Sequence, residues 1–339
     1  MDSLPLDDLD RRIVHGLAVA GRAPLSRIAA ALDVSDRTVA HRYRRLRAAG
    51  LRVVGVVDGR RLGWVEWLVR MRCAPDAAPA VAEALARRDD TAWVGLAAGG
   101  TEITCVTRSR DSPLLAKLAR TPRIHTITAQ CLLRAVAGTA GWHGRTDALD
   151  PGQIERIRGP RTVPTGPVRI TDADRPLLRA LAVDGRTGYP ALSSATGRSQ
   201  STVRRRLAEL LGGGALYLDV DVDPALLGHT CQAMLWLTVA PTELTSVTAA
   251  LAEHREIAYA AATTGATNVA AFAVCRDLDA LYDYLTTRIG ALPGVLQVET
   301  TPITELVKRA GARVPPGAGM AESTDRWMGS AGRFHRRPG

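Results

Sequence analysis

Arginine side chains are concentrated on one predicted helix near the start of the chain (SDRTVAHRYRRLRAAG, residues 35–50). Ser35 is a favoured N-cap residue, and Val39, Tyr43 and Leu46 share one apolar face. The other faces carry Arg37, His41, Arg42, Arg44, Arg45 and Arg47. Guanidinium groups on an exposed helix can bind the phosphates and base edges of DNA. For a single helix, a solvated basic face without a ligand is the alternative.

The preceding residues predict a second helix that supports the basic one. The segment 25–32 (LSRIAAAL) has apolar residues on one side, and Asp33 and Val34 form a short turn before the basic helix, which ends at Gly50. A helix, a tight turn and a basic helix make a helix-turn-helix (HTH) motif, whose second helix enters the major groove. The same layout returns about 164 residues later, which favours DNA binding over a solvated face.

The composition narrows the class of protein. The chain has 339 residues, of which 46% are hydrophobic and 23% are charged, so folded domains are expected. The net charge of +10 and the pI of about 10.0 favour an anionic partner, either nucleic acid or a membrane surface. No apolar run approaches the roughly 20 residues of a membrane span. The acidic N-terminus lacks the apolar segment of a signal peptide.

Five cysteines are scattered singly, without the Cys/His spacing of a metal site. We expect them to be small buried residues of a cytoplasmic protein. The sequence therefore predicts no metal, no cofactor and no membrane partner.

The segments around the basic helix predict a mixed α+β unit. A helix at 6–19 precedes the HTH motif and a strand at 51–57 follows it. Strands and helices then follow in the order βαββαβ, over 64–73, 75–88, 91–96, 101–107, 113–118 and 124–133. This is the order of a ferredoxin-like fold, an antiparallel sheet with helices on one face. The open face must be covered, most simply by a second copy.

The whole pattern is then repeated, which indicates an internal duplication. Three segments, 170–174, 184–186 and 199–210, match 6–10, 20–22 and 35–46, and Leu227-Gly228 matches Leu62-Gly63. A second βαββαβ pattern runs over 230–306. The segment 189–193 predicts a less regular helix than its counterpart in the first copy.

We therefore expect HTH or winged-helix domains and ferredoxin-like domains, duplicated in tandem. The predicted units are a first HTH domain (1–60), a ferredoxin-like domain (64–135), a linker rich in Gly, Pro, Arg and Thr (136–167), a second HTH domain (168–225), a second ferredoxin-like domain (229–310) and a disordered tail (311–339). Within the linker, a short helix is expected at 151–157.

Several spaced elements resemble the N-terminal signature of the Lrp/AsnC transcriptional regulators. They are Leu6-Asp7-x-x-Asp10, Gly21-Arg22, Val34-Ser35-x-x-Thr38-Val39-x-x-Arg42-x-x-x-Leu46-x-x-x-Gly50 and Leu62-Gly63. The downstream half resembles the effector domain of that family, called RAM for regulation of amino-acid metabolism. The resemblance implies a regulator that binds double-stranded DNA, responds to an amino-acid-like effector and forms homo-oligomers. With two copies, the chain resembles a fused dimer, and its further assembly stays open.

The predicted DNA-binding residues lie at the same places in both copies. They are Ser35, Arg37, Thr38, His41, Arg42, Arg44 and Arg45 in the first, and Ser199, Gln200, Ser201, Arg204, Arg205 and Arg206 in the second. Base edges are expected to contact Arg37, His41, Arg44, Gln200, Ser201 and Arg204. Phosphates are expected to contact Arg42, Arg45, Arg47, Arg205 and Arg206. For Arg42 and Arg206 the alternative is that they brace the fold through nearby acids.

The resemblance also points to two turns as effector sites. They contain Gly99, Gly100, Thr101 and Glu102 in the first copy, and Gly265, Ala266, Thr267 and Asn268 in the second. Backbone N–H groups beside a polar side chain would suit an amino acid. Glu102 and Asn268 replace the usual aspartate of the family. The alternative is that the glycines only provide the positive φ of a hairpin turn.

Two other functions remain open for this domain plan. Sirohaem decarboxylases resemble these regulators but are enzymes, and the seven histidines of the chain could serve a tetrapyrrole. Such enzymes have no need of two arginine-rich helices, so we expect a protein without enzymatic activity. An architectural protein that binds DNA with little sequence preference is the other alternative.

Overall fold

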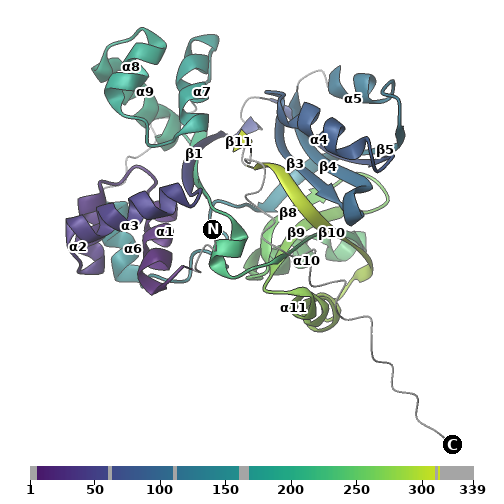
Figure 1. The fold of residues 1–339 in the computed structure, drawn as a ribbon. Coiled ribbons are helices and arrows are strands. Elements are labelled where there is room, and N and C mark those ends of the chain that lie inside the picture. Colours follow the sequence, from purple (N-terminus) through teal and green to yellow (C-terminus); the bar gives the residue numbers. More distant parts are fainter. Residues whose placement is uncertain (1–5, 60–62, 110–112, 160–167, 310–311, 314–339) are drawn as a thin grey trace, which may run out of the picture.

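The computed structural model describes residues 6–59, 63–109, 113–159, 168–309 and 312–313. Two small helical domains lie next to a larger body of strands covered by helices (Figure 1). Each helical domain is an HTH domain, and the body contains both ferredoxin-like domains.

The first HTH domain consists of α1 (Asp8–Val19), α2 (Leu25–Leu32) and α3 (Asp36–Ala48). The Ser35 side chain accepts a hydrogen bond from the Thr38 backbone N–H at 3.1 Å, which caps α3 as expected. Val39 and Leu46 are fully buried, and Gly50 has a φ of +97°, which other residues rarely adopt. The basic helix therefore begins, packs and ends as its sequence predicts.

The second HTH domain repeats this plan with α7 (Arg175–Val183), α8 (Tyr189–Thr196) and α9 (Gln200–Gly212). Ser199 caps α9, and Gly214 has a φ of +65°, like Gly50 in the first copy. The expectation of a less regular α8 is wrong, because α8 has eight residues, as α2 does. Pro190 lies in its first turn, where proline favours a helix rather than breaking it.

The two HTH domains are joined by a two-stranded antiparallel sheet of β1 (Arg52–Val57) and β6 (Leu216–Asp221). Within the HTH domains, residue n of the first copy corresponds to residue n + 164 of the second. Val53 pairs with Val220, and Val56 pairs with Tyr217. Tyr217 is the counterpart of Val53 and Val220 is the counterpart of Val56, so exchanging the two copies turns one pair into the other. The register is therefore symmetric about a pseudo-two-fold axis between the copies.

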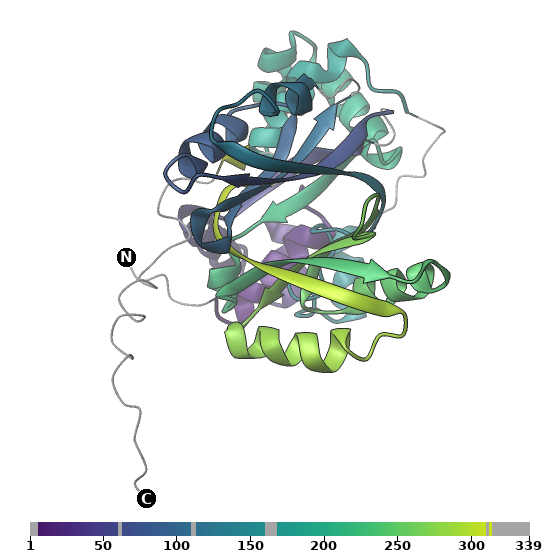
Figure 2. The ribbon, with the colours of Figure 1, turned by 90° about the vertical axis from the view of Figure 1, so that its right-hand side faces the viewer.

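Both ferredoxin-like domains have the predicted βαββαβ order. The first contains β2 (Val65–Cys73), α4 (Ala78–Ala86), β3 (Thr91–Ala97), β4 (Glu102–Ser109), α5 (Pro113–Leu118) and β5 (Ile124–Ala137). The second contains β7 (Cys231–Val239), α10 (Leu244–Glu253), β8 (Ile257–Thr263), β9 (Val269–Cys275), α11 (Leu278–Asp283) and β10 (Val295–Arg309). A π-helical turn continues α11 over Tyr284–Ile289. The helices of the two halves cover opposite outer sides of the strands (Figure 2).

The last strand of each half belongs to both sheets. β5 pairs with β2 along its first part and with β8 along its second, and β10 pairs in the same way with β7 and then β3. Leu132 faces Thr263, and its counterpart Ile303 faces Ala97, so the pseudo-two-fold symmetry extends through the body. The strands thus form one closed sheet, and neither half can leave the other without breaking β5 and β10.

The inner faces of the two halves pack on one another, which confirms the expectation that each open face is covered by the other copy. The rings of Trp93 and Phe272 meet edge to face with centroids 5.3 Å apart, and Trp236 is 1% exposed. Aromatic pairs of this geometry add to the stabilisation from burial alone. This inner core is continuous with the core of the first HTH domain, whereas the second HTH domain has a core of its own.

Much of the predicted linker is folded, and its expected short helix is present as part of the first HTH domain. It contains α6 (Pro151–Arg158), which packs on α1 and α2 and is capped reciprocally by Asp150 and Gln153. Trp142, 5% exposed, donates its indole N–H to the carbonyl of Arg255 in the second ferredoxin-like domain at 2.6 Å. Glycine and proline dominated the composition and concealed these apolar residues. The rest of the linker (160–167) and most of the predicted tail (311 and 314–339) lie outside the described residues.

Two residues of the predicted tail, Ala312–Arg313, form β11 at the edge of β10. Among the described helices, none is both long enough and apolar enough to cross a membrane.

If α6 belongs to the first HTH domain, Ile157→Ala should lower the stability of the protein. Ile157 is fully buried, and its Cδ1 atom approaches Gly16 of α1 closely. We expect the substitution to lower the free energy of unfolding by about 2–4 kcal/mol in chemical denaturation. The matched control on the same helix is Glu155→Ala, which should change it by less than about 0.5 kcal/mol. Equal small effects of the two substitutions would show that α6 is not part of the core.

Candidate nucleic-acid interface

The exposed surface of α3 carries the predicted base-contacting side chains. Arg37, His41 and Arg44 are all exposed, on the side opposite to the buried Val39 and Leu46. No ion pair to these arginines is recorded in the described part of the chain, and Arg44 has only a 3.4 Å hydrogen bond to the Ala40 carbonyl in its own helix. These cations are therefore available to an external anion.

Ser35 and Thr38 were also predicted to contact DNA. Their hydroxyl oxygens lie 2.8 Å apart, and the Ser35 hydroxyl also accepts the Thr38 N–H. Both residues are therefore engaged at the start of α3, where they fix the end of the helix that would approach a duplex.

Arg42 and Arg45 both contact acids of the first helix or its N-cap. Arg42 forms ion pairs with Asp7 and Asp10, and Arg45 forms a second one with Asp10, whose side chain is fully buried. Burial acts to raise the pKa of Asp7, but hydrogen bonds from the Asp10 N–H and from Arg42 outweigh it and lower that pKa. Arg42 therefore makes the contacts with nearby acids that the alternative describes, and its role toward phosphates stays a prediction.

Arg47 is held across the domain boundary, and its expected role as a phosphate contact stays a prediction. Its guanidinium group lies 2.8 Å from the carboxylate of Asp184 in the second HTH domain. Arg45 differs from Arg47 because its side chain is still 54% exposed.

The exposed surface of α9 carries a different set of side chains. Gln200, Ser201, Arg204 and Arg205 are exposed. The Arg204 guanidinium lies over the ring of Tyr189 in α8, 4.7 Å from its centroid, which orients the charge toward solvent. Within the ranges that the structure describes, Arg205 has a distant partner, 3.9 Å away, in Glu209 of the same helix. Ser199 and Ser201 share a hydrogen bond at the start of the helix.

Arg206 occupies the place of Arg42 and makes the same type of contact. It donates to both oxygens of Asp174, at 2.9 and 2.8 Å, and to Glu209 at 3.0 Å. Burial acts to raise the pKa of Asp174, but the hydrogen bonds from Arg206 and Thr171 lower it to about 2. Arg206 therefore braces α9 against the start of its domain, which is the arrangement that the alternative describes, and its role toward phosphates stays a prediction.

The two Gly-Arg elements of the signature contact one another's domains. Arg22 donates to the carbonyls of Gly185 and Thr187 at 2.6 and 2.9 Å. Arg186 donates to those of Gly21 and Ala23 at 2.6 and 3.0 Å. We call these four hydrogen bonds the arginine clasp. It fixes the two HTH domains relative to each other.

The predicted effector turns are closed by internal contacts. Glu102 is 2% exposed and forms an ion pair with Arg70 at 2.7 Å. Asn268 accepts from the N–H of Val239 and donates to its carbonyl, at 2.8 and 2.7 Å. Thr267 accepts hydrogen bonds from Gln130 of the other half. Neither Glu102 nor Asn268 presents a free side chain to a ligand.

The glycines of these turns have the backbone that a hairpin needs. Gly99, Gly100 and Gly265 have φ values of +67°, +84° and +107°, and Ala98 is also positive at +50°. Thr101 donates its hydroxyl to the Ala98 carbonyl at 2.8 Å. A structural reason for glycine therefore exists at these positions without any ligand.

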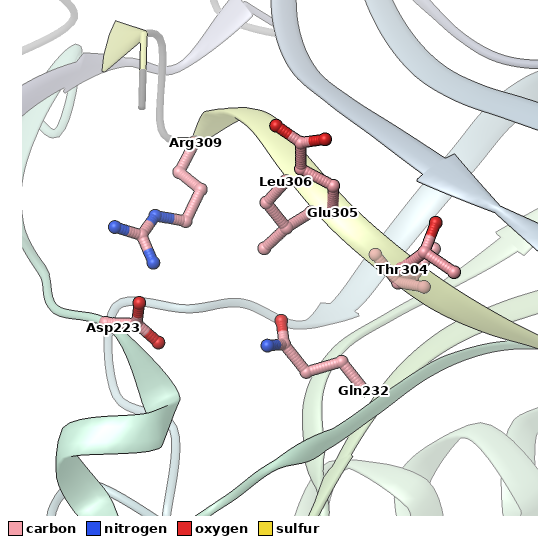
Figure 3. Close-up of a pocket in the computed structure, with 7 residues that line it drawn as sticks. Asp223, Gln232, Thr304, Glu305, Leu306 and Arg309 are labelled. Atoms are coloured by element: carbon pink, nitrogen blue, oxygen red, sulfur yellow. The ribbon is translucent and has the colours of Figure 1, made fainter. Parts of the chain in front are cut away.

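A small hollow lies where the second HTH domain joins the body. Figure 3 shows Arg309 of β10 and Gln232 of β7 directed into it, with Asp223 nearby. Arg309 lies 3.1 Å from Asp221, a buried carboxyl group whose pKa is raised by that burial. The cavity volume is about 30 Å³, which suits one or two water molecules rather than an amino acid or a tetrapyrrole.

The sequence missed the arginine clasp and the buried acids. Leu6-Asp7-x-x-Asp10 and Gly21-Arg22 were recognised only as parts of a signature, not as partners of the basic helix or of the second copy. The signal was present, because Asp10 and Arg42 recur together as Asp174 and Arg206, which indicates a paired contact.

The Asp174–Arg206 pair predicts a pH-dependent stability. Because the folded pKa of about 2 lies below the ordinary value of 3.8, the carboxylate stabilises the fold above about pH 4. We expect Asp174→Asn to lower the free energy of unfolding by about 2 kcal/mol at pH 7. The gap to the unsubstituted protein should narrow as pH falls from 4 toward 2.

The matched control is Asp172→Asn, because the Asp172 side chain is 89% exposed and its substitution should change stability by less than about 0.5 kcal/mol. A gap between Asp174→Asn and the unsubstituted protein that stays constant from pH 7 to pH 2 would contradict the assigned pair.

Comparisons with known proteins agree with this architecture. The AsnC-type helix-turn-helix domain matches residues 6–47 and 170–211, and the Lrp/AsnC ligand binding domain matches residues 232–312. An HTH-type transcriptional regulator of Pyrococcus abyssi is 28% identical over 148 residues, covering 43% of this chain and 94% of the relative. The regulatory protein AsnC of Escherichia coli is 27% identical over 146 residues, covering 41% and 96%.

A solved structure with similarity over nearly the whole chain is the siroheme decarboxylase NirDL in complex with an iron-uroporphyrin III analogue. The TM-score is 0.58, with 95% of this chain and 97% of that chain covered, at 14% identity, so the likeness concerns the fold alone. The two HTH matches, the ligand-binding match and the regulator relatives decide the family. The chain belongs to the Lrp/AsnC family of transcriptional regulators, with the family's two-domain unit duplicated in tandem.

Proposed function

We propose that this protein is a sequence-specific DNA-binding regulator whose two HTH domains contact one duplex. The observation that carries the proposal is the division among the basic side chains of α3 and α9. Arg42 and Arg206 are bound to acids beneath the helices, whereas Arg37, Arg44, Arg204 and Arg205 project outward. A helix that is braced from below and basic above is suited to the major groove.

The mechanism follows from these two sets of arginines. The ion pairs with Asp10 and Asp174 hold each helix at a fixed angle to its domain, so the exposed side chains approach DNA with little loss of freedom. The arginine clasp holds the helices at a fixed angle to each other. Exposed guanidinium groups would then donate to base edges, and Arg205, together with the exposed part of Arg45, would contact phosphates.

We also propose that a small effector of the amino-acid class binds to the ferredoxin-like RAM domains. The protein would act in the cytoplasm, as an assembly of more than one chain. The effector turns support effector binding through their backbone N–H groups at Gly99, Gly100, Gly265 and Ala266, because the side chains of Glu102 and Asn268 are already bonded. An effector would change DNA binding only if it had different affinities for two arrangements of the chain or its assembly.

A second candidate function is that of a sirohaem-decarboxylase-like enzyme. The whole-chain similarity in fold to NirDL favours it, since the same arrangement of four domains supports an enzyme there. We place the regulator first because its relatives over the HTH and RAM regions are regulators, and because both basic helices keep exposed arginines.

The DNA-binding proposal is tested by removing two exposed arginines together. We expect Arg37→Ala, Arg44→Ala to weaken binding to a duplex selected from a random pool by roughly ten-fold or more, since each base contact is worth about 1–3 kcal/mol. Fluorescence anisotropy at a fixed salt concentration measures the change.

The charge-matched control is Arg87→Ala, which removes an exposed arginine beside α4, on the body, and should leave affinity unchanged. Unchanged binding by the double variant, or an equal loss of affinity in the control, would reject α3 as the recognition helix.

Ligand titrations separate the two candidate functions. We expect calorimetry with the twenty amino acids to give heat for at least one, and we expect no shift of the absorbance band when iron-uroporphyrin III is titrated with the protein. The physical reason is that backbone N–H groups at a turn suit a carboxylate, whereas a tetrapyrrole needs a large apolar pocket. A saturable band shift, together with no heat from any amino acid, would favour the enzyme.

A further inference from the structure

The two recognition helices share a buried framework but differ on their exposed faces. Ser35, Val39 and Leu46 have identical counterparts in Ser199, Val203 and Leu210, and both helices are braced by an arginine bound to a buried acid. The exposed positions do not match. The outer face of α3 consists, in order, of Asp36, Arg37, the half-buried Ala40, His41 and Arg44. The equivalent positions of α9 are Gln200, Ser201, Arg204, Arg205 and Ala208.

At three of the five positions, one helix has an arginine where the other has a small side chain. Arginine at 37 and 44 is replaced by Ser201 and Ala208, and Ala40 is replaced by Arg204. Arginine pairs best with guanine, whereas glutamine, here Gln200, pairs best with adenine. A base pattern that suits one helix would leave the other with unpaired donors.

The frame that presents these helices is nonetheless symmetric. The mirror-image register of β1 and β6 and the reciprocal bonds of Arg22 and Arg186 relate the two HTH domains by a pseudo-two-fold axis. A two-fold arrangement of recognition helices places its half-sites in inverted orientation on the duplex. The direction of each half-site is therefore set by the fold, and its sequence by the exposed residues.

We propose that the DNA target is an inverted arrangement of two unlike half-sites, one read by Arg37, His41 and Arg44 and the other by Gln200, Ser201 and Arg204. The proposal rests on the DNA-binding function proposed above and goes beyond it, because it states that the target has a direction. The chain would bind a site in one orientation only, which a symmetric homodimer cannot do.

The primary test is selection of binding sites from random duplexes by the full chain. The expected motif has two different halves at a fixed spacing. A palindromic motif would overturn the proposal while leaving DNA binding intact. Recovery of no motif at all would instead reject the sequence-specific function, and the proposal with it.

A transplant of exposed residues sharpens the test. Gln200→Asp, Ser201→Arg, Arg204→Ala, Arg205→His and Ala208→Arg give α9 the exposed face of α3. This variant should select a palindrome of the first half-site and bind the original target roughly ten-fold or more weakly. Because Arg204→Ala removes the contact with Tyr189, a second variant keeps Arg204 and carries only Gln200→Asp, Ser201→Arg and Ala208→Arg.

The matched control alters the first copy instead. Arg37→Ser with Arg44→Ala should change the selected sequence in one half-site and leave the other half-site as it was. Thermal unfolding shows whether each variant is folded. If both folded transplant variants still select the original motif, or if the control alters both half-sites equally, the assignment of the helices to separate half-sites is wrong.

Discussion

The placement of both recognition helices depends on the arginine clasp and the strand pair beside it. Arg22 and Arg186 each donate to two backbone carbonyls of the other HTH domain. Hydrogen bonds from a charged donor contribute about 1.5–3 kcal/mol each, so four of them are a large share of the stability of a small domain pair. The approach is close, since a Cβ atom on Gly21 would lie 2.9 Å from Val53. Glycine followed by arginine thus has a physical reason at both positions.

The two HTH domains are attached unequally to the body. The first shares a continuous core with the paired sheets. The second has a separate core and contacts the first through β1, β6 and the clasp. Local opening in proteins is easiest where few buried contacts hold a unit. Any motion that alters the angle between the recognition helices is therefore concentrated at the second HTH domain.

Periodicity and repetition were enough to predict the elements, and internal matching was enough to predict the duplication. The N-caps, the buried faces of α3 and α9 and both βαββαβ orders followed from local patterns. The contacts that were not predicted join residues that are far apart in the sequence. No local signal shows that β5 and β10 pair with both sheets, or that Arg42 turns inward while Arg44 turns outward, because partners such as Asp10 are distant in sequence. In the linker the short helix that contains Ile157 was predicted, but the burial of Trp142 was not, because the stretch around it is rich in glycine.

The covalent connection of the two copies changes how the paired unit responds to dilution. Two separate chains lose their partner when their concentration falls below the dissociation constant of the dimer. Here β5 and β10 are exchanged within a single polypeptide, so the pairing is intramolecular and the effective concentration of one half around the other is fixed by the chain. The two HTH domains therefore stay together even at a few molecules per cell, where a dimer of ordinary affinity would have dissociated.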